Sequence, residues 1–219
     1  MTDKMTDKVQ INTLTLGALQ TNCYLVNCVK TLDAIIIDPA DDGEAIVEEV
    51  LTRQLHPLAI ILTHGHFDHV LGCLSVKLAF DIPIYLHPSD NFLIKKAQAS
   101  AEHWTKISAD PVPPADRQLV DGQIISFGQI SFQVIHSPGH TPGSCSLLFS
   151  PDFNPNHDED NLTTNNKILF AGDVIFKDGF GRTDFQYCRR GQLFKSIDLI
   201  RQLAPNALTY PGHGEPFYL

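Results

Sequence analysis

The sequence predicts an α/β fold in which β-sheets are covered by helices. Short runs rich in Ile, Val, Leu, Thr and Tyr alternate with helical patterns in both halves of the chain. The run at 58–63 is apolar throughout, which is typical of a strand that is buried on both faces. Four apolar strands run directly into turns that contain Gly or Pro and carry His or Asp. Together these observations favour helix-covered sheets over an all-β sandwich.

The first half begins with strands and then alternates between helices and strands. Its expected strands are residues 10–16, 22–29, 33–37, 58–63 and 82–86. Its expected helices are residues 43–55, 70–80 and 89–107. The last of these helices is polar, and the prolines at 111, 113 and 114 interrupt the chain after it.

The second half repeats this rhythm. Its expected strands are residues 124–127, 130–135, 145–149, 167–170 and 207–210, and an amphipathic helix is expected at 191–203. Residues 151–166 are polar and have little to bury, so we expect a surface loop there.

Composition limits the classes of partner. The chain has 219 residues, with 16 Lys and Arg against 25 Asp and Glu, and its formal net charge is −9. An acidic surface repels phosphate backbones and anionic lipids, so we expect neither a nucleic-acid nor a membrane partner. The polar N-terminus contains no apolar signal core, and the five scattered cysteines form no CxxC motif. These features predict a cytoplasmic protein with reduced thiols.

The turns after four strands carry the residues with metal-binding chemistry. They occur within 58–69, 131–140, 167–173 and 207–213. The first turn supplies three imidazoles and one carboxylate between His64 and His69. Imidazole with carboxylate suits Zn²⁺, Fe²⁺ or Mn²⁺, whereas Mg²⁺ and Ca²⁺ prefer sites built from oxygen. The sequence therefore predicts a metal site at these strand ends.

The chain resembles the metallo-β-lactamase superfamily through its HxHxDH signature, and within it the glyoxalase II (hydroxyacylglutathione hydrolase) branch. The segments that carry this resemblance are THGHFDH, HSPGHTPGS, FAGDVIF, GRTDF and YPGHG, in the order of the family. The resemblance covers essentially the whole chain. It implies a four-layer αββα sandwich formed by a single domain over 1–219, without the C-terminal helical domain that helps to bind glutathione.

The resemblance also implies a set of metal ligands. The first metal ion would be bound by His64, His66 and His140, the second by Asp68, His69 and His213, and both by Asp173. Two divalent ions are implied, with zinc expected and iron or manganese as alternatives. Asp68, His69 and Asp173 would be the catalytic residues. Asp38 either orients a ligand or is simply a turn carboxylate before a proline.

The resemblance implies hydrolysis of a small-molecule thioester such as S-lactoylglutathione by a hydroxide that bridges the metal ions. The alternative is a persulfide dioxygenase, with one iron held by His64, His140 and Asp173. β-Lactam hydrolysis, tRNA processing and a non-enzymatic role are less favoured. The sequence specifies neither the oligomeric state nor the physiological substrate.

Residues for the substrate are less well defined than the metal ligands. Arg182 and Asp184 stand where the glutathione-specific members have Lys and Tyr, and Arg182 is the candidate for holding a carboxylate. Further candidates for the pocket are Lys177, Tyr187, Arg189 and Arg190. We expect Phe92 and Trp104 to be packing residues or to line the cleft, and Cys73 and Cys145 to be in the core. The histidines expected to have no special role are His56, His87, His103, His136 and His157.

Overall fold

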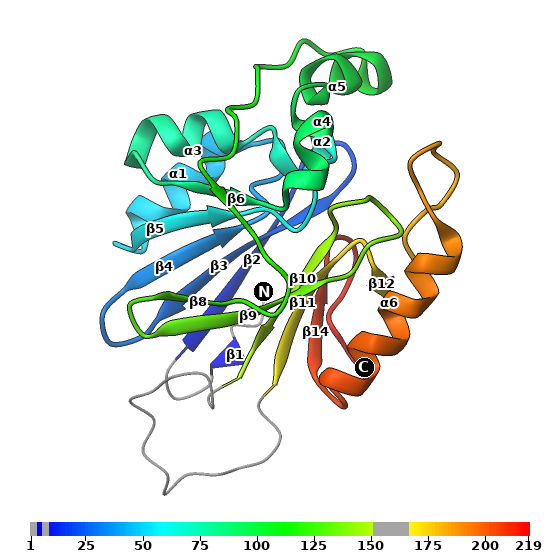
Figure 1. The fold of residues 1–219 in the computed structure, drawn as a ribbon. Helices are drawn as coiled ribbons and strands as arrows, with labels where there is room; N and C mark the ends of the chain where they lie inside the picture. Colours follow the sequence, from blue (N-terminus) through cyan, green and yellow to red (C-terminus); the bar gives the residue numbers. More distant parts are fainter. Residues whose placement is uncertain (1–3, 6–8, 151–166) are drawn as a thin grey trace, which may run out of the picture.

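The protein is a four-layer αββα sandwich in which two mixed β-sheets face each other between helices (Figure 1). The computed structural model describes residues 4–5, 9–150 and 167–219, so the expected surface loop at 151–166 lies outside the described residues. Helices α1 and α3 cover one sheet, and α6 covers the other. The architecture that the resemblance implied is therefore confirmed.

Within the described residues the first sheet has seven strands, in the order β1-β2-β3-β4-β5-β6-β7. They are β1 (Lys4–Met5), β2 (Val9–Leu16), β3 (Thr21–Cys28), β4 (Asp33–Ile37), β5 (His56–Ile61), β6 (Ile84–Leu86) and β7 (Arg117–Gln118). The pairs from β1 to β4 are antiparallel, and those from β4 to β7 are parallel. Because β4, β5 and β6 run in the same direction, helices connect them across one face of the sheet.

The second sheet has six strands among the described residues, in the order β15-β14-β11-β10-β9-β8. They are β8 (Ile124–Phe127), β9 (Ile130–His136), β10 (Cys145–Phe149), β11 (Ile168–Gly172), β14 (Leu208–Pro211) and β15 (Phe217–Tyr218). The pair β11–β14 is parallel, and α6 (Arg190–Leu203) provides its crossover. A separate hairpin joins β12 (Ile175–Phe176) to β13 (Gly179–Phe180).

Side chains on the strands alternate between two buried environments. Tyr24 and Val26 of β3 face the core between the sheets, whereas Cys23 and Leu25 pack against the helices. Successive residues of a strand point to opposite faces, so a sheet between two layers needs apolar side chains at every position. This requirement explains the continuous apolar runs in the sequence. Both cysteines that were expected in the core lie there, and all five cysteines are buried and free.

The helices differ from the sequence prediction mainly in being divided. They are α1 (Gly43–Thr52), α2 (Phe67–Val70), α3 (Cys73–Phe80), the 3₁₀ turn η1 (Pro88–Asp90), α4 (Asn91–Ile94), α5 (Ala97–Thr105) and α6. The single helix expected at 70–80 is interrupted at Gly72, where a Cβ would lie 2.2 Å from the carbonyl oxygen of Pro39. The helix expected at 89–107 is three short elements. No helix in the described residues has both the length and the apolar character needed to cross a membrane.

The expected strands are all present, three of them with the expected bounds and the others with bounds shifted by one or two residues. The sequence analysis missed the short strands β1, β7, β12, β13 and β15. Each of them has only two residues. Two residues are too few to produce an alternating pattern, so pairing with a neighbouring strand is what defines these elements.

A stacked pair of histidines predicts a pH dependence of stability. The rings of His87 and His136 lie 4.1 Å apart at an interplanar angle of 9°. Burial lowers the pKa of His87 from its usual 6.5, and the His136 ring lowers it further. The folded and unfolded states therefore bind the same number of protons above about pH 6.5, and the unfolded state binds more below it. We expect His87 to cost stability as the pH falls from about 6.5 toward the lowered pKa.

The test compares the wild type with His87→Asn in urea unfolding at pH 7.5 and pH 5.5. In the wild type the backbone N–H of Ser89 donates a hydrogen bond of 3.3 Å to Nδ1 of His87. The side-chain oxygen of asparagine can accept the same hydrogen bond. The loss of unfolding free energy between the two pH values should be smaller in the variant. Equal losses in the two proteins would contradict the prediction, because every other titrating group is common to both.

Candidate metal centre

The structure brings all seven side chains with expected metal-ligand chemistry to one edge of the sandwich. They come from the turn after β5 (His64 and His66), from α2 (Asp68 and His69), from the turn between β9 and β10 (His140), and from the ends of β11 (Asp173) and β14 (His213). Strands from both sheets thus end at the same place. The rigid sheets fix the positions of these turns, as a metal site requires.

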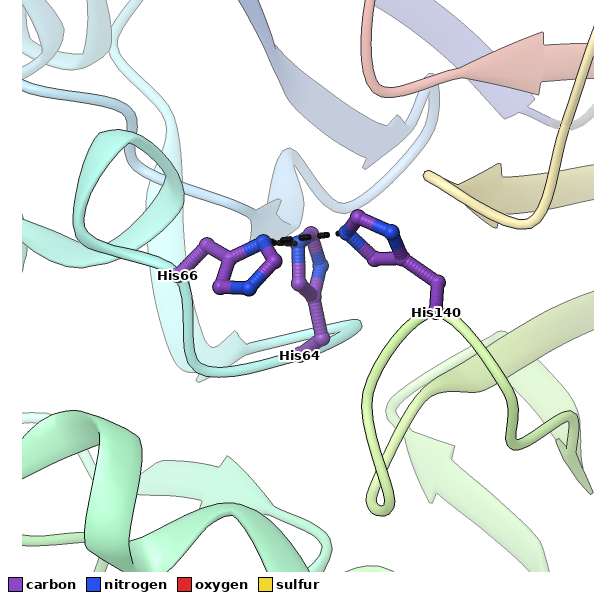
Figure 2. A group of neighbouring side chains, drawn as sticks. All are labelled: His64, His66 and His140. Atoms are coloured by element: carbon purple, nitrogen blue, oxygen red, sulfur yellow. Dashed lines mark hydrogen bonds between the residues drawn. The ribbon is translucent and has the colours of Figure 1, made fainter. Parts of the chain in front are cut away.

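Three histidines form the first group of potential ligands (Figure 2). Nε2 of His64 lies 3.1 Å from Nδ1 of His66, and Nε2 of His140 lies 2.9 Å from the same atom. Figure 2 shows the three rings converging from two separate turns. Three imidazole nitrogens at one point are a set suited to Zn²⁺, Fe²⁺ or Mn²⁺.

The second group contains Asp68, His69 and His213. Oδ2 of Asp68 lies 3.5 Å from Nε2 of His69 and 3.4 Å from Nε2 of His213. Thr21 Oγ1 donates a hydrogen bond of 2.9 Å to the same carboxylate oxygen. Asp68 is therefore held in place from the first sheet while it faces the two imidazoles.

Asp173 lies between the two groups. Its Oδ2 is 3.6 Å from Nε2 of His140 in the first group and 3.5 Å from Nε2 of His213 in the second. Its Oδ1 is 3.5 Å from Nε2 of His69. Oδ2 is thus near both groups and Oδ1 is near the second, so this single carboxylate is placed to contact two cations at once.

Each of the five imidazoles is anchored through the nitrogen that points away from the centre. The outward contacts are His64 Nδ1 to Thr63 Oγ1 (3.0 Å), His66 Nε2 to Tyr187 OH (2.9 Å), His69 Nδ1 to Asp38 Oδ2 (3.0 Å), His140 Nδ1 to the Arg182 carbonyl (3.0 Å) and His213 Nδ1 to the Leu19 carbonyl (3.1 Å). Oxygen partners of this kind fix the ring orientation and the tautomer of metal-bound histidines.

The donor set fits a divalent cation at each group. If every outward nitrogen carries the proton, every inward nitrogen presents a lone pair, and lone pairs at about 3 Å from one another repel unless a cation lies between them. In the described part of the chain, His69 Nε2 and Asp173 Oδ1 are buried without a hydrogen-bond partner. Buried polar atoms without partners are costly, so these two atoms indicate a ligand between them.

Burial and charge give the two groups different electrostatics. Burial lowers the pKa of His64 well below 6.5 and, with the neighbouring His140, lowers that of His66 to about 3. Burial would raise the pKa of Asp68, but the charge on His69 and a hydrogen bond from His213 lower it to about 2. Burial opposes charge on His213 too, yet hydrogen bonds with Asp173 and Asp68 raise its pKa to about 10. His64 and His66 are thus held neutral, and the second group carries the carboxylate of Asp68, which attracts cations.

Asp38 orients a ligand, which decides between the two interpretations that the sequence left open. Its Oδ2 accepts hydrogen bonds from His69 Nδ1 at 3.0 Å and from Thr63 Oγ1 at 2.6 Å, and its Oδ1 accepts from the Thr63 backbone N–H at 2.8 Å. Both carboxylate oxygens are therefore used to position the ring of His69 and the start of the histidine turn.

Sequence analysis missed Asp90, which joins the two turns that carry the first group. This buried carboxylate accepts hydrogen bonds from the backbone N–H of Gly65 at 3.0 Å, from Thr141 Oγ1 at 2.6 Å and from the backbone N–H of Gly143 at 2.7 Å. Its partners are 25 to 53 positions away in the chain. No local pattern could have revealed it.

Close packing also constrains the turn that carries His213. A Cβ at Gly212 would lie 2.2 Å from Oδ1 of Asp173 and 2.7 Å from Cε1 of His69. Only glycine lets the backbone pass this close to the carboxylate between the groups. The glycine of the YPGHG segment is therefore part of the geometry of the centre.

A cavity of about 740 Å³ opens beside the ligands and is lined partly by aromatic side chains. Arg182, the candidate substrate residue, lines it, and its Nε and Nη2 donate to Asp184 at 2.8 and 2.7 Å. Phe92, Trp104 and Tyr187 line it as well. Of the other candidates for the pocket, Lys177, Arg189 and Arg190 are not among the lining residues.

The chain is similar to a family model, to a named relative and to solved structures. A family model described as the metallo-beta-lactamase superfamily matches residues 16–151. A Haemophilus influenzae protein named hydroxyacylglutathione hydrolase GloC is 30% identical over 94% of this chain and 91% of its own length. The solved B3 metallo-beta-lactamase BLEG-1 is 32% identical, with a TM-score of 0.82 and coverage of 95% and 93%. TTHA1623, solved in a di-iron-bound form, is 35% identical, with a TM-score of 0.78 and coverage of 94% of each chain.

Proposed function

This chain belongs to the metallo-beta-lactamase superfamily, and on that premise we propose that it is a two-metal hydrolase that cleaves thioesters. The position of Asp173 is the observation that carries the proposal. Its carboxylate lies within 3.6 Å of inward nitrogens from both ligand groups. The mononuclear alternative would use His64, His140 and Asp173. It would leave the remaining four side chains of the centre without a role, namely His66, Asp68, His69 and His213.

We assign the seven ligands as the sequence analysis did. His64, His66 and His140 hold one cation, Asp68, His69 and His213 hold the other, and Asp173 contacts both. When bound, two divalent cations lower the pKa of a water between them and polarise the carbonyl under attack. The donor set suits zinc, and the di-iron form of TTHA1623 supports iron as the alternative.

The residues of the chain position the reaction. Asp68 is fixed through Oδ2 by Thr21 and by the two imidazoles, and its Oδ1 is the atom that we assign to accept a proton from the attacking water. Asp38 keeps His69 in the orientation that presents Nε2 to the centre. A thiolate leaves readily without a proton, which agrees with a cavity wall that offers few acidic groups outside the ligands.

The relative named hydroxyacylglutathione hydrolase supports a thioester as the substrate. S-Lactoylglutathione is therefore the first compound to assay. The likeness to BLEG-1 makes a β-lactam the necessary comparison.

The experiment measures bound metal and activity in the same preparation, purified without added metal. We expect two metal ions per chain and hydrolysis of S-lactoylglutathione or of another thioester in a panel. Treatment with a chelator should abolish hydrolysis, and added Zn²⁺, Fe²⁺ or Mn²⁺ should restore it. His66→Ala is the control: it removes one nitrogen of the first group, so it should lower both the bound metal and the rate of hydrolysis.

Two results would contradict the proposal. One iron per chain with oxygen uptake on glutathione persulfide would favour the persulfide dioxygenase instead. Hydrolysis of β-lactams without hydrolysis of any thioester would show that the superfamily assignment is right and that the substrate is wrong.

A further inference from the structure

We propose that the cavity beside the metal centre binds thioesters that are largely apolar and carry one carboxylate, and that Lys96 is the residue that pairs with this carboxylate. That the ligand is a thioester rests on the proposed function. Its apolar and anionic character follows from the side chains of the cavity. We therefore expect a ligand that is more apolar than a glutathione thioester.

Away from the expected ligands, most of the side chains that line the cavity are apolar. One wall comes from the segment of α4 and α5 and includes Phe92, Trp104 and Ile107. A second wall contains Phe185 and Tyr187, whose rings stack with centroids 5.4 Å apart. Phe92 contacts Tyr187 edge to face at 5.5 Å, so the two walls meet. Rings that converge beside a reactive centre are typical of a site for an apolar ligand.

The rim of the cavity exposes large apolar side chains. Leu19, Trp104 and Ile107 are 49%, 59% and 65% exposed, and all three line the cavity. An apolar surface left in water next to a reactive centre marks a place where a ligand covers it. The hydrophobic effect therefore favours a substrate whose non-reacting part extends over this rim.

Apart from the histidines of the metal centre, Lys96 and Arg182 are the cationic side chains that line the cavity, and within the described residues only Lys96 has no ion pair. The Arg182 guanidinium uses two N–H groups on Asp184 and lies 4.2 Å above the ring of Phe185. The exposed ammonium of Lys96 has no ion pair with any described residue. Tyr187 OH is already bound to His66. Lys96 is thus the cation that the cavity offers to an anionic group of the ligand.

The break between α4 and α5 places Lys96 at the cavity. Its backbone N–H bonds to the Leu93 carbonyl at 2.9 Å, and its own carbonyl accepts from Ser100 at 2.8 Å. Leu93 and Ala97 line the cavity with it, whereas the neighbouring Lys95 does not. Lys95 is also exposed, so it provides a matched control.

The test uses binding of thioethers, which cannot be hydrolysed. The probes are 3-(benzylthio)propanoate and its uncharged carboxamide. Trp104 is the only tryptophan of the chain and lines the cavity, so its fluorescence reports binding there. We expect the carboxylate to bind about 2- to 5-fold more tightly than the amide, the range of a partly exposed ion pair. Lys96→Met should remove this preference, and Lys95→Met should keep it.

The apolar part of the proposal has its own comparison. The methyl analogue, 3-(methylthio)propanoate, should bind about 10-fold or more weakly than the benzyl probe, because it buries much less apolar surface. Phe92→Ala should weaken binding of the benzyl probe and leave that of the methyl analogue nearly unchanged.

Several results would overturn the assignment. Trp104 fluorescence that does not respond to the benzyl probe would exclude binding at this wall. A carboxylate preference that survives Lys96→Met, or that is lost in Arg182→Met alone, would place the anion elsewhere. Because the probes are thioethers, these outcomes are independent of whether the protein hydrolyses thioesters. Failure of hydrolysis with intact binding would overturn the proposed function alone.

Discussion

Asp173→Asn is expected to lower kcat/KM for thioester hydrolysis by about 10²- to 10³-fold, the loss seen when one electrostatic group is removed from an active site. The substitution keeps the shape of the side chain and removes its charge. Because Asp173 lies within 3.6 Å of His140, His69 and His213, the variant should lose affinity for metal at both groups. Metal analysis after dialysis, together with steady-state kinetics, measures both effects.

The matched control for this variant is Asp198→Asn, which removes an exposed carboxylate from α6, away from the cavity lining. It should change kcat/KM by less than about 2-fold, as surface substitutions usually do. The unfolding free energy of both variants shows whether lost activity reflects lost folding. If Asp173→Asn kept two metal ions and wild-type activity, a carboxylate shared between the groups would be ruled out.

The placement of His and Asp side chains at strand ends could be predicted because it follows from local pattern, whereas the assignment of metal ligands rested on the family resemblance. His64 and His213 come directly after apolar strands, and such strands end at the edges of sheets. The alternation of Tyr24 and Val26 with Cys23 and Leu25 likewise follows from the period of a strand. A pattern of this kind depends only on residues that are close in the sequence, so it can be recognised in a single sequence.

The partners of the supporting residues could not be predicted, because they are distant in the sequence. Tyr187 was a candidate for the pocket, but its hydrogen bond with His66 spans 121 positions. Arg182 and Asp184 are close in the sequence, but nothing in the sequence shows that Nε and Nη2 of the guanidinium both donate to this carboxylate. Trp104 could be a core residue or a cavity residue on its pattern alone, and its 59% exposure decides for the cavity. Contacts between residues far apart in the sequence therefore determine the hydrogen bonds and the cavity around the expected ligands.

Asp90→Ala is expected to destabilise the fold by about 3 kcal/mol, because it removes a buried carboxylate that accepts three hydrogen bonds. The donors are the N–H groups of Gly65 and Gly143 and the hydroxyl of Thr141. Asp90→Asn should cost less, since its amide keeps one oxygen and turns an NH₂ toward a donor. Urea unfolding of the metal-free protein measures this loss.

The same variants test whether Asp90 positions the first ligand group. Gly65 lies between His64 and His66, and Thr141 follows His140, so releasing these turns should loosen all three imidazoles. A loss of about 10- to 100-fold in metal affinity is typical when a group that supports metal ligands is removed. Asp90→Asn should lie between the wild type and Asp90→Ala in both stability and affinity, whereas Asp198→Ala should match the wild type. Lower stability of Asp90→Ala with unchanged metal affinity would contradict this role. Asp90 would then stabilise the two turns without positioning the histidines, whose geometry would depend on their strands alone.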